Sequence, residues 1–265
     1  MPEHILPLPP RWERDVECGW VVFRSGPDEI RGYFAKPKGG RNLPGIIMVH
    51  ENLGIIENRQ DVTRRLAHEG YAALTVDLYS RNGGQSPRDF KTPEERRLKA
   101  SRITLDEDTI PDLEAGAAFL ASLPEVDPAR IGAIGYCSGG GTLYGWVSGH
   151  STNLKAAVVF YGAADFSGDA RPDGKPVDRT RTAHLLQIPI QVHHGDADRA
   201  VKLADATRMV EALKTSQQPV EFHVYPGADH AFHDDTHPQY HEAAAKQAWR
   251  RAMEFLAGYL HPAPR

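Results

Sequence analysis

The sequence predicts an α/β fold, with a mostly parallel central sheet covered by helices on both faces. Short, continuously apolar runs alternate along the chain with longer segments whose apolar residues have helical spacing. This rhythm is typical of a parallel sheet whose strands are buried on both sides. The length of 265 residues, of which 40% are hydrophobic, is sufficient for one large domain with a substantial core.

The N-terminal part of the chain divides into an arm and a hairpin. Residues 1–18 are rich in proline and irregular, so we expect a surface arm there and a single domain over residues 19–265. Two strands are expected at 19–24 and 29–35, because the intervening segment Ser25-Gly-Pro-Asp28 is typical of a hairpin turn.

The remaining elements alternate along the rest of the chain. Strands are expected at 45–50, 71–78, 131–136, 154–161, 189–194 and 220–225. Helices are expected at 58–69, 108–123, 203–214 and 240–260, the first ended by Gly70 and the second by Pro124. Two polar insertions, 81–107 and 163–187, follow sheet strands, and each is either the border of a substrate pocket or a plain surface loop.

The motif Gly135-Tyr-Cys-Ser-Gly139 stands between a predicted strand and a helix-compatible segment. This is the pattern of a nucleophile elbow, a sharp strand-to-helix turn whose central residue carries the reacting group. Glycines two residues before and after the centre let strand and helix approach each other while the centre adopts a strained conformation. Only Cys137 has both glycines, since Ser138 would need one in place of Tyr136, so Cys137 is the predicted nucleophile.

A cysteine nucleophile needs a base and a group that orients the base. In proteins with this elbow, an acid and then a histidine follow the nucleophile along the chain. Asp196 and Asp198 follow the next-to-last predicted strand, and His230 follows the last one. Three residue types in the right order, each at the carboxyl end of a predicted strand, indicate a catalytic site.

Charge and hydropathy exclude several classes of function. The net charge is −4, from 31 basic and 35 acidic residues, and without a basic block no nucleic-acid binding is expected. No stretch approaches the roughly 20 apolar residues of a membrane span, and the first residues lack the apolar core of a signal peptide. Cys18 and Cys137 are expected to be free, because a disulfide would consume the elbow thiol, and a reducing compartment such as the cytoplasm follows.

The chain also resembles a known family, dienelactone hydrolase (carboxymethylenebutenolidase), within the α/β-hydrolase superfamily. The resemblance extends from about residue 19 to residue 260. It is carried by His50-Glu-Asn-Leu-Gly54, Gly70-Tyr-Ala-Ala73, Asp77-Leu-Tyr-Ser-Arg81, Gly135-Tyr-Cys-Ser-Gly-Gly140, Gly195-Asp-Ala-Asp198 and Gly227-Ala-Asp-His-Ala-Phe232. It implies an α/β-hydrolase fold and an enzyme that hydrolyses small lactones or activated carboxylic esters through an acyl-thioester, with no cofactor.

The resemblance implies roles for particular residues. Asp198 matches the acid of a Cys137–His230–Asp198 triad, which leaves Asp196 to brace the turn. Glu51 matches a glutamate that hydrogen-bonds the resting thiol and accepts its proton when substrate displaces it, which favours the reactive thiolate.

Further roles concern the substrate. The backbone N–H groups of Asn52 and Ser138 are expected to hold the oxyanion of the reaction, the first from the early loop and the second from the residue after the nucleophile. Arg81 matches an arginine that helps to bind a substrate carboxylate, and Tyr136 is a further expected substrate contact. A second arginine of the family would lie four residues after His230, where this chain has Asp234.

Asp234 departs from the family pattern and should repel an anionic substrate. A carboxylated lactone as substrate therefore depends on a replacement cation, for which Arg199 and the arginines of the segment 171–181 are candidates.

A general carboxylesterase of broad substrate range is one alternative to a hydrolase specific for lactones or activated esters. Three further alternatives assign the site a different role. His230, His233, His237 and His241 have spacings compatible with zinc, although Pro238 interrupts the segment that would align them. A protein of this fold that binds a small ligand without turnover is the second alternative. A redox role for the elbow cysteine is the third, and it requires the only other cysteine to lie close by.

Overall fold

The computed structural model describes residues 15–84, 92, 94, 106–150, 153–166 and 176–261. The predicted N-terminal arm lies outside these residues except for its last four, and so does most of the insertion 81–107. The first strand begins at Val16, within the segment predicted as the arm, because Val16 already pairs with Pro37 in the hairpin.

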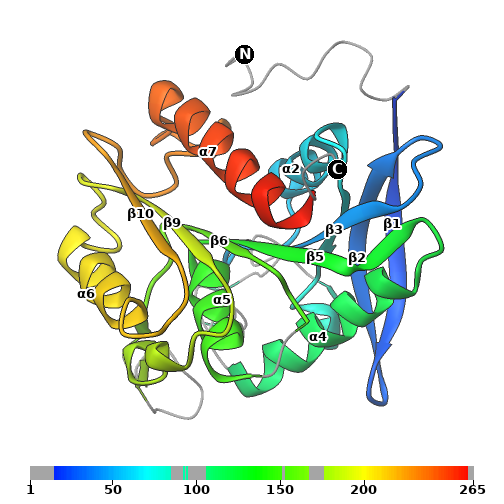
Figure 1. Cartoon of the computed structure of the whole chain (residues 1–265), viewed down its shortest axis with the longest axis horizontal. Helices are drawn as coiled ribbons and strands as arrows, with labels where there is room; N and C mark the ends of the chain where they lie inside the picture. The colour runs from blue at the N-terminus through cyan, green and yellow to red at the C-terminus, as the bar shows by residue number, and fades with distance from the viewer. Residues whose placement is uncertain are drawn as a thin grey trace.

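Eight strands form one sheet in the order β1-β2-β4-β3-β5-β6-β9-β10 (Figure 1). The first two pair antiparallel with each other, β2 pairs antiparallel with β4, and the remaining pairs are parallel, which confirms the predicted mostly parallel sheet. The strands are β1 (Val16–Ser25), β2 (Asp28–Pro37), β3 (Leu43–Val49), β4 (Ala72–Val76), β5 (Val126–Tyr136), β6 (Ala157–Phe160), β9 (Ile190–Gly195) and β10 (Val220–Tyr225).

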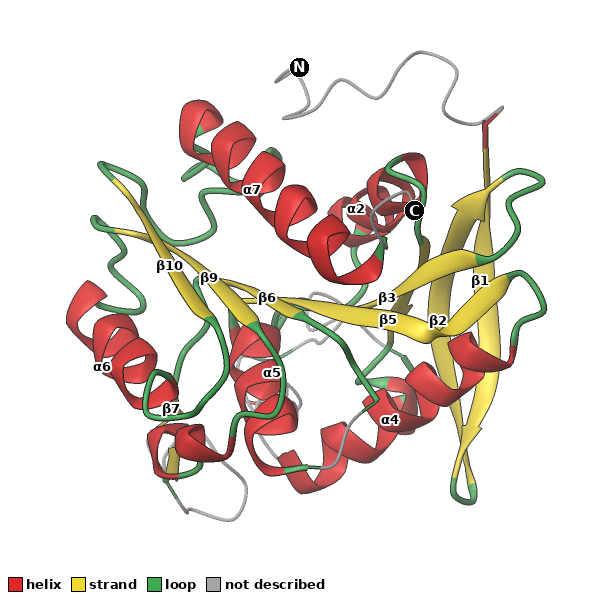
Figure 2. Cartoon of the chain, viewed as in Figure 1, coloured by secondary structure: helices red, strands yellow, loops and turns green. Residues whose placement is uncertain are grey.

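Helices cover both faces of the sheet, as predicted (Figure 2). One face carries α2 and α7, and the opposite face carries α4, α5 and α6. The helices are α2 (Glu57–His68), α4 (Asp106–Ser122), α5 (Ser138–Gly149), α6 (Leu203–Leu213) and α7 (Glu242–Leu260). No helix among the described residues is sufficiently long and apolar to cross a membrane.

The apolar run of the central strand β3 is uninterrupted because both of its faces are buried. Ile46 and Met48 belong to the hydrophobic cluster beneath α2 and α7, whereas Ile47 and Val49 belong to the cluster beneath α4 and α5. Successive side chains of a strand point to opposite faces, so a strand buried on both faces must be apolar at every position.

Some boundaries differ from the predictions. The strand β5 begins at Val126, five residues before the predicted start, because its first part is partly exposed and lacks the apolar signal of a buried strand. Conversely, the strand predicted over 154–161 is limited to 157–160, the residues that pair with both neighbouring strands. Among the described residues of the insertion 163–187, β7 (Asp165–Phe166) pairs antiparallel with β8 (Val177–Asp178), and two 3₁₀ turns follow, η4 (Arg179–Arg181) and η5 (Ala183–Leu185).

The topology determines where a site can form. The chain leaves β3 for its neighbour β4 and later returns on the other side of β3 as β5. In open α/β sheets, ligands bind outside the carboxyl ends of the strands at such a reversal of strand order. The loops that follow β3, β5, β9 and β10 all leave this same edge of the sheet, and they carry the predicted catalytic residues.

Candidate active site

The elbow between β5 and α5 has the strained geometry that its glycines predict. Cys137 has φ 52° and ψ −120°, outside the regions that L-residues ordinarily occupy. A Cβ at Gly139 would lie 2.5 Å from the carbonyl oxygen of Val49 and closer still to that of His50, and one at Gly135 would lie 2.8 Å from the carbonyl oxygen of Gly139. The first turn of α5 therefore approaches the end of β3 at a distance that only glycine permits.

Three of the predicted residues form a hydrogen-bonded series. The Sγ atom of Cys137 lies 3.0 Å from Nε2 of His230, and Nδ1 of His230 lies 2.9 Å from Oδ2 of Asp198. The other oxygen of Asp198 accepts hydrogen bonds from the backbone N–H groups of Ala200 and Val201, both at 2.8 Å. The buried carboxylate is thus held with one oxygen directed at the imidazole.

The environment of His230 favours the protonated imidazole. Burial on its own lowers the pKa of His230, but the hydrogen bonds to Asp198 and Cys137 outweigh burial and raise the pKa to about 10. A protonated histidine donates from both ring nitrogens, so it donates to the carboxylate on one side and to the sulfur on the other. This arrangement suits a sulfur that reacts as a nucleophile.

Two aspartates brace the loops that carry the acid and the base. The Oδ1 atom of Asp229 accepts from the backbone N–H groups of His230 at 2.7 Å and of Arg199 at 3.0 Å. Burial raises the pKa of Asp229, but these hydrogen bonds and the Arg199 side chain hold it well below its usual range. Asp196 accepts from the backbone N–H of Gly227 at 2.7 Å, which is the bracing role expected for it.

The loop after β3 is held by two side chains, His50 and Tyr79, for which the sequence predicted no such role. Nε2 of His50 accepts from the backbone N–H of Leu78 at 3.1 Å, so Nδ1 carries the proton and donates to the carbonyl oxygen of Glu51 at 2.6 Å. The hydroxyl of Tyr79 donates to the carbonyl oxygen of Asn52 at 2.8 Å. His50 lies in the family motif 50–54 and Tyr79 in the motif 77–81, and these motifs were the only indication in the sequence that the two side chains matter.

Arg59 is the functional candidate that sequence reasoning missed. Its Nε lies 2.7 Å from Oε2 of Glu51, its Nη2 lies 3.5 Å from Oδ2 of Asp234, and its guanidinium carbon lies 4.4 Å from the ring centre of Tyr136. Burial lowers the pKa of Arg59, but the charge of Glu51 in particular raises it above the ordinary value. The sequence contains one indication of this role, which is that α2 begins directly after the loop that carries Glu51 and so places Arg59 near it along the chain.

The pairing of Glu51 differs from the expected one. The sulfur of Cys137 forms its hydrogen bond with His230, and the ion pair of Glu51 is with Arg59. Glu51 nevertheless lines the same cavity as Cys137. That Glu51 receives the thiol proton stays a prediction.

A cavity of about 90 Å³ opens over the elbow. Its lining combines the residues that follow β3, β5, β6 and β10 with the first turn of α2. The lining residues are Glu51, Asn52, Leu53, Arg59, Cys137, Tyr161, His230, Ala231, Asp234 and His237.

The structure does not bring the two expected substrate contacts to this cavity. Tyr136 is completely buried, because the alternation along β5 directs its ring into the core beneath α2 and α7. Arg81 forms ion pairs with Asp112, at 2.6 Å, and with Asp28. Their roles as substrate contacts stay predictions.

The suggested replacement cations also lie elsewhere among the described residues. Arg199 is exposed and paired with Asp229, and Arg179 is buried and paired with Asp106. Arg181 is exposed, and Arg171 lies outside the described residues.

The histidines considered for zinc have other partners. His230 belongs to the series with Cys137, and His233 is buried in a stack on Trp249. His237 and His241 each accept a hydrogen bond from a backbone N–H through Nδ1. Within the described part of the chain, no group of three or more His, Cys, Asp or Glu residues is placed to hold a metal ion.

Both cysteines are free, and the sheet keeps them apart. Cys18 lies on the edge strand β1, four strand positions from β5, and strands are about 4.8 Å apart, so roughly 19 Å separates the two strands. A resolving role for Cys18 toward Cys137 therefore has no geometric support.

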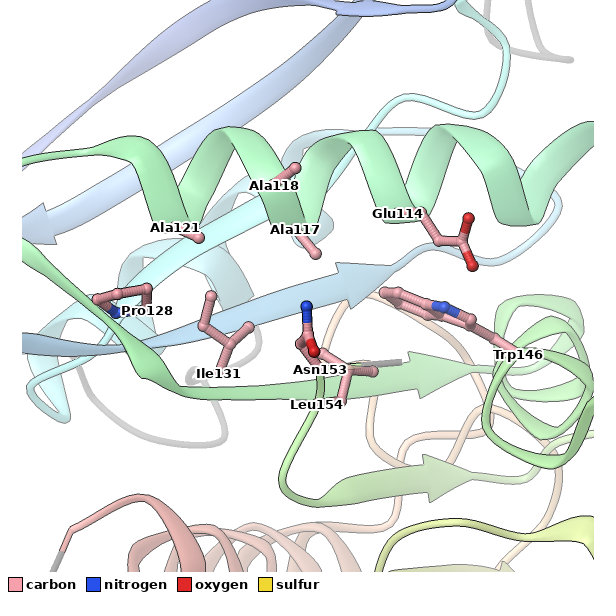
Figure 3. A pocket seen from close by; sticks show the side chains of 9 residues that line it. All are labelled: Glu114, Ala117, Ala118, Ala121, Pro128, Ile131, Trp146, Asn153 and Leu154. Atoms are coloured by element: carbon pink, nitrogen blue, oxygen red, sulfur yellow. The ribbon is translucent and has the colours of Figure 1, made fainter. Parts of the chain in front are cut away.

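A larger cavity, of about 440 Å³, lies away from the elbow on the α4 side of the sheet (Figure 3). Its walls include Glu114 and Ala117 of α4, Trp146 of α5 and Leu154. Neither Cys137 nor His230 lines it, so this larger cavity is not the one that the predicted catalytic residues share.

The fold and the elbow define the class of protein. The sheet is mostly parallel and lies between two helical layers. A strained cysteine elbow follows β5, an acid follows β9 and a histidine follows β10. This is the architecture of an α/β hydrolase. The model of the dienelactone hydrolase family matches residues 30–260, so the chain belongs to the dienelactone hydrolase family.

Individual relatives agree with this assignment. The chain is 34% identical over 245 residues to a Salmonella typhimurium protein named "Putative carboxymethylenebutenolidase", covering 92% of this chain and 88% of the relative. A Methylorubrum extorquens protein of the same name is 34% identical over 233 residues, covering 87% and 77%. A crystal structure of a "Putative Dienelactone Hydrolase" from Klebsiella pneumoniae superposes with a TM-score of 0.81 at 30% identity, covering 92% of this chain and 99% of that one.

Proposed function

We propose that this hydrolase cleaves small lactones or activated carboxylic esters through the side chain of Cys137. The observation that carries the proposal is the series from Asp198 through His230 to Cys137 at the wall of a cavity, with distances of 2.9 Å and 3.0 Å. The names of the relatives, which describe carboxymethylenebutenolidases, support a lactone among the substrates.

In the first step, the sulfur of Cys137 attacks the carbonyl carbon, and the carbonyl π electrons move to the oxygen. Ser138 is the first residue of α5, so its N–H has no intrahelical acceptor and lies at the positive end of the helix. We assign this N–H and that of Asn52, which also lines the cavity, to the oxyanion.

In the second step, the carbonyl group re-forms and the bond to the leaving oxygen breaks. His230 transfers its proton to that oxygen, and an acyl-thioester on Cys137 remains. In a lactone the leaving oxygen stays attached to the acyl chain. A thiolate is itself a good leaving group, so enolates and phenolates are expelled productively more easily than alkoxides.

Water then completes the reaction. Neutral His230 removes a proton from water, the oxygen adds to the thioester, and the C–S bond breaks to release the acid. The proton that remains on the imidazole restores the starting pair with Cys137. Asp198 orients His230 throughout, because its two backbone hydrogen bonds hold it in place.

We test the proposal with the variant Cys137→Ala and the matched control Cys18→Ser, which alters the only other cysteine of the chain. The substrates are 4-nitrophenyl acetate and the aryl lactone dihydrocoumarin. Cys137→Ala should lower kcat/KM for both by about 10³-fold or more, and Cys18→Ser should leave it within twofold.

The acyl-thioester is tested separately with His230→Ala, in which hydrolysis of the intermediate is slow. Mass spectrometry after a brief exposure to 4-nitrophenyl acetate should show one acetyl group on the peptide that contains Cys137, removable by hydroxylamine. Undiminished turnover by Cys137→Ala would refute the nucleophile. Equal turnover of alkyl and aryl esters would indicate a general carboxylesterase, and ligand binding without any turnover would indicate a binding protein.

A further inference from the structure

Arg59 brings a cation to the catalytic cavity, and two carboxylates flank it. The guanidinium lies between Glu51, at 2.7 Å from Nε, and Asp234, at 3.5 Å from Nη2. The side chain of Arg59 is only 2% exposed, and those of the two acids are 9% and 6% exposed. All three residues line the cavity that contains Cys137.

Two buried nitrogens of Arg59 make no hydrogen bond among the described residues: Nε, which forms the ion pair with Glu51, and Nη1. Leaving a buried donor unpaired is costly, and such donors in native proteins ordinarily have a partner. Arg59 lines the cavity, and a substrate oxygen that reaches the guanidinium there would give Nη1 a partner.

The charges around Arg59 decide which kind of oxygen fits. Cys137 and His230 share a hydrogen bond, and in the resting state of the proposed reaction the imidazolium and the thiolate contribute no net charge as a pair. His237, the second histidine of the lining, accepts from a backbone N–H through Nδ1, so that nitrogen carries no proton. Burial raises the pKa of Tyr161, which also lines the cavity, so its hydroxyl is uncharged. The lining then holds two carboxylates and one guanidinium, and its net charge is negative.

An anionic group next to Arg59 would meet this negative charge in a place where water screens poorly. Like charges brought together at a desolvated site cost binding free energy, whereas a neutral carbonyl or ether oxygen accepts from Nη1 without that cost. The charge of Arg59 is already compensated by Glu51 and Asp234, but its hydrogen-bond donor is still available.

We infer that Arg59 and Asp234 make this cavity selective for an uncharged acyl group. Nη1 of Arg59 donates to a neutral oxygen of the lactone or ester, and the carboxylate of Asp234 disfavours substrates that carry a carboxylate at that position. The inference rests on the proposed hydrolysis through Cys137 and specifies its substrate class: neutral lactones and esters in preference to carboxylated ones.

The test uses two aryl esters that differ only in charge. Mono-4-nitrophenyl adipate carries a carboxylate at the end of its acyl chain, and its methyl ester is neutral, while the leaving group is the same. The wild-type enzyme should prefer the neutral ester in kcat/KM by about tenfold or more, after subtraction of the uncatalysed rate. Asp234→Asn should reduce this preference by about tenfold, which corresponds to ~1.4 kcal/mol.

The neighbouring residue provides the matched control. Asp235 is also a buried carboxylate, but it pairs with Arg65 and does not line the cavity. Asp235→Asn should therefore leave the ratio of the two esters unchanged. Asparagine at position 234 can still accept from Thr236 through its side-chain oxygen, so the turn is preserved, and a thermal melt verifies that both variants fold.

A second variant addresses the donor. Arg59→Lys keeps the positive charge but removes the planar guanidinium and its Nη1 donor, so KM for the neutral ester should rise about fivefold while kcat changes less. A purely structural role would lower the amount of folded enzyme without this split between KM and kcat.

The inference is overturned if the wild-type enzyme hydrolyses the anionic ester as well as the neutral one, or if Asp234→Asn leaves their ratio unchanged. Either result leaves the proposed function intact as long as Cys137→Ala abolishes turnover of both esters. Turnover that survives in Cys137→Ala refutes the proposed function itself, so the two failures are distinguishable.

Discussion

The carboxylate of Asp198 contacts His230 with only one of its oxygens. Oδ2 lies 2.9 Å from Nδ1 of His230, and Oδ1 is occupied by the backbone N–H groups of Ala200 and Val201. These hydrogen bonds prevent the carboxylate from rotating away, so the imidazole is oriented with its other nitrogen toward Cys137.

Asp198→Asn should therefore lower kcat by about 10³-fold with KM changed by less than threefold, because the amide keeps the shape but loses the charge that stabilises the imidazolium. Steady-state kinetics with 4-nitrophenyl acetate measures the effect. Asp196→Asn is the matched control on the same loop and should stay within threefold of wild type, since asparagine can still accept from Gly227. A similar kcat for both variants would contradict a role for Asp198 in catalysis.

Replacing Cys137 should change the titration of His230. The pKa of about 10 depends on hydrogen bonds to Asp198 and to Cys137, so Cys137→Ala should lower it by about one unit or more. Histidine ¹⁵N chemical shifts recorded from pH 6 to pH 10.5 report the protonation state of His230 directly. Wild-type His230 should be protonated at pH 8, and Cys18→Ser should titrate like wild type. A neutral imidazole in the wild-type protein at pH 8 would count against the proposed resting pair.

The close approach at Gly139 predicts a large loss of stability for Gly139→Ala. The added Cβ would meet the carbonyl oxygens of Val49 and His50, which are backbone atoms that cannot rotate away. We expect a loss of about 2–3 kcal/mol or more in the free energy of unfolding, measured by urea titration.

Gly149, at the other end of α5, is the matched control for this substitution. A Cβ there meets no atom within 4 Å, and alanine favours helix over glycine, so Gly149→Ala should leave the stability unchanged or raise it by up to ~1 kcal/mol. Equal changes in stability at both positions would contradict the idea that the close approach of β3 excludes a Cβ at position 139.

The buried histidine His233 predicts sensitivity to acid. Burial, reinforced by the charges of Arg59 and Arg65, holds the pKa of His233 well below its usual value. Below about pH 6.5 the unfolded chain binds a proton at this residue that the folded protein does not, so the free energy of unfolding falls as pH falls, by up to ~1.4 kcal/mol per pH unit.

His233→Phe removes this titration and keeps a ring against Trp249. Urea midpoints at pH 7.5 and pH 5.5 should therefore differ less in this variant than in the wild-type protein. His68→Gln alters an exposed histidine of α2 and should leave the difference as in wild type. If His233→Phe shows the wild-type difference, the acid sensitivity arises elsewhere.

Much of the fold could be predicted because it depends on local patterns. Apolar runs mark strands such as β3 and β4, and Gly70, with φ 98°, ends α2 as expected. The beginning of β5 could not be predicted in this way, since its first residues are partly exposed and only their pairing makes them a strand.

Within the site, Cys137 and His230 could be predicted along the chain, because the glycine spacing of an elbow and the order of residues at the carboxyl ends of parallel strands are visible in the sequence. The same order left Asp196 and Asp198 as candidates, and the resemblance to the family favoured Asp198. The surroundings of these residues, in contrast, depend on the tertiary structure. It paired Glu51 with Arg59, placed Asp234 beside them, and directed Arg81 toward Asp112. The physical reason is that an ion pair depends on which charged groups the packing of α2 and the loops brings within a few ångströms, and a charged residue in a helical pattern gives no sign of whether it will be buried.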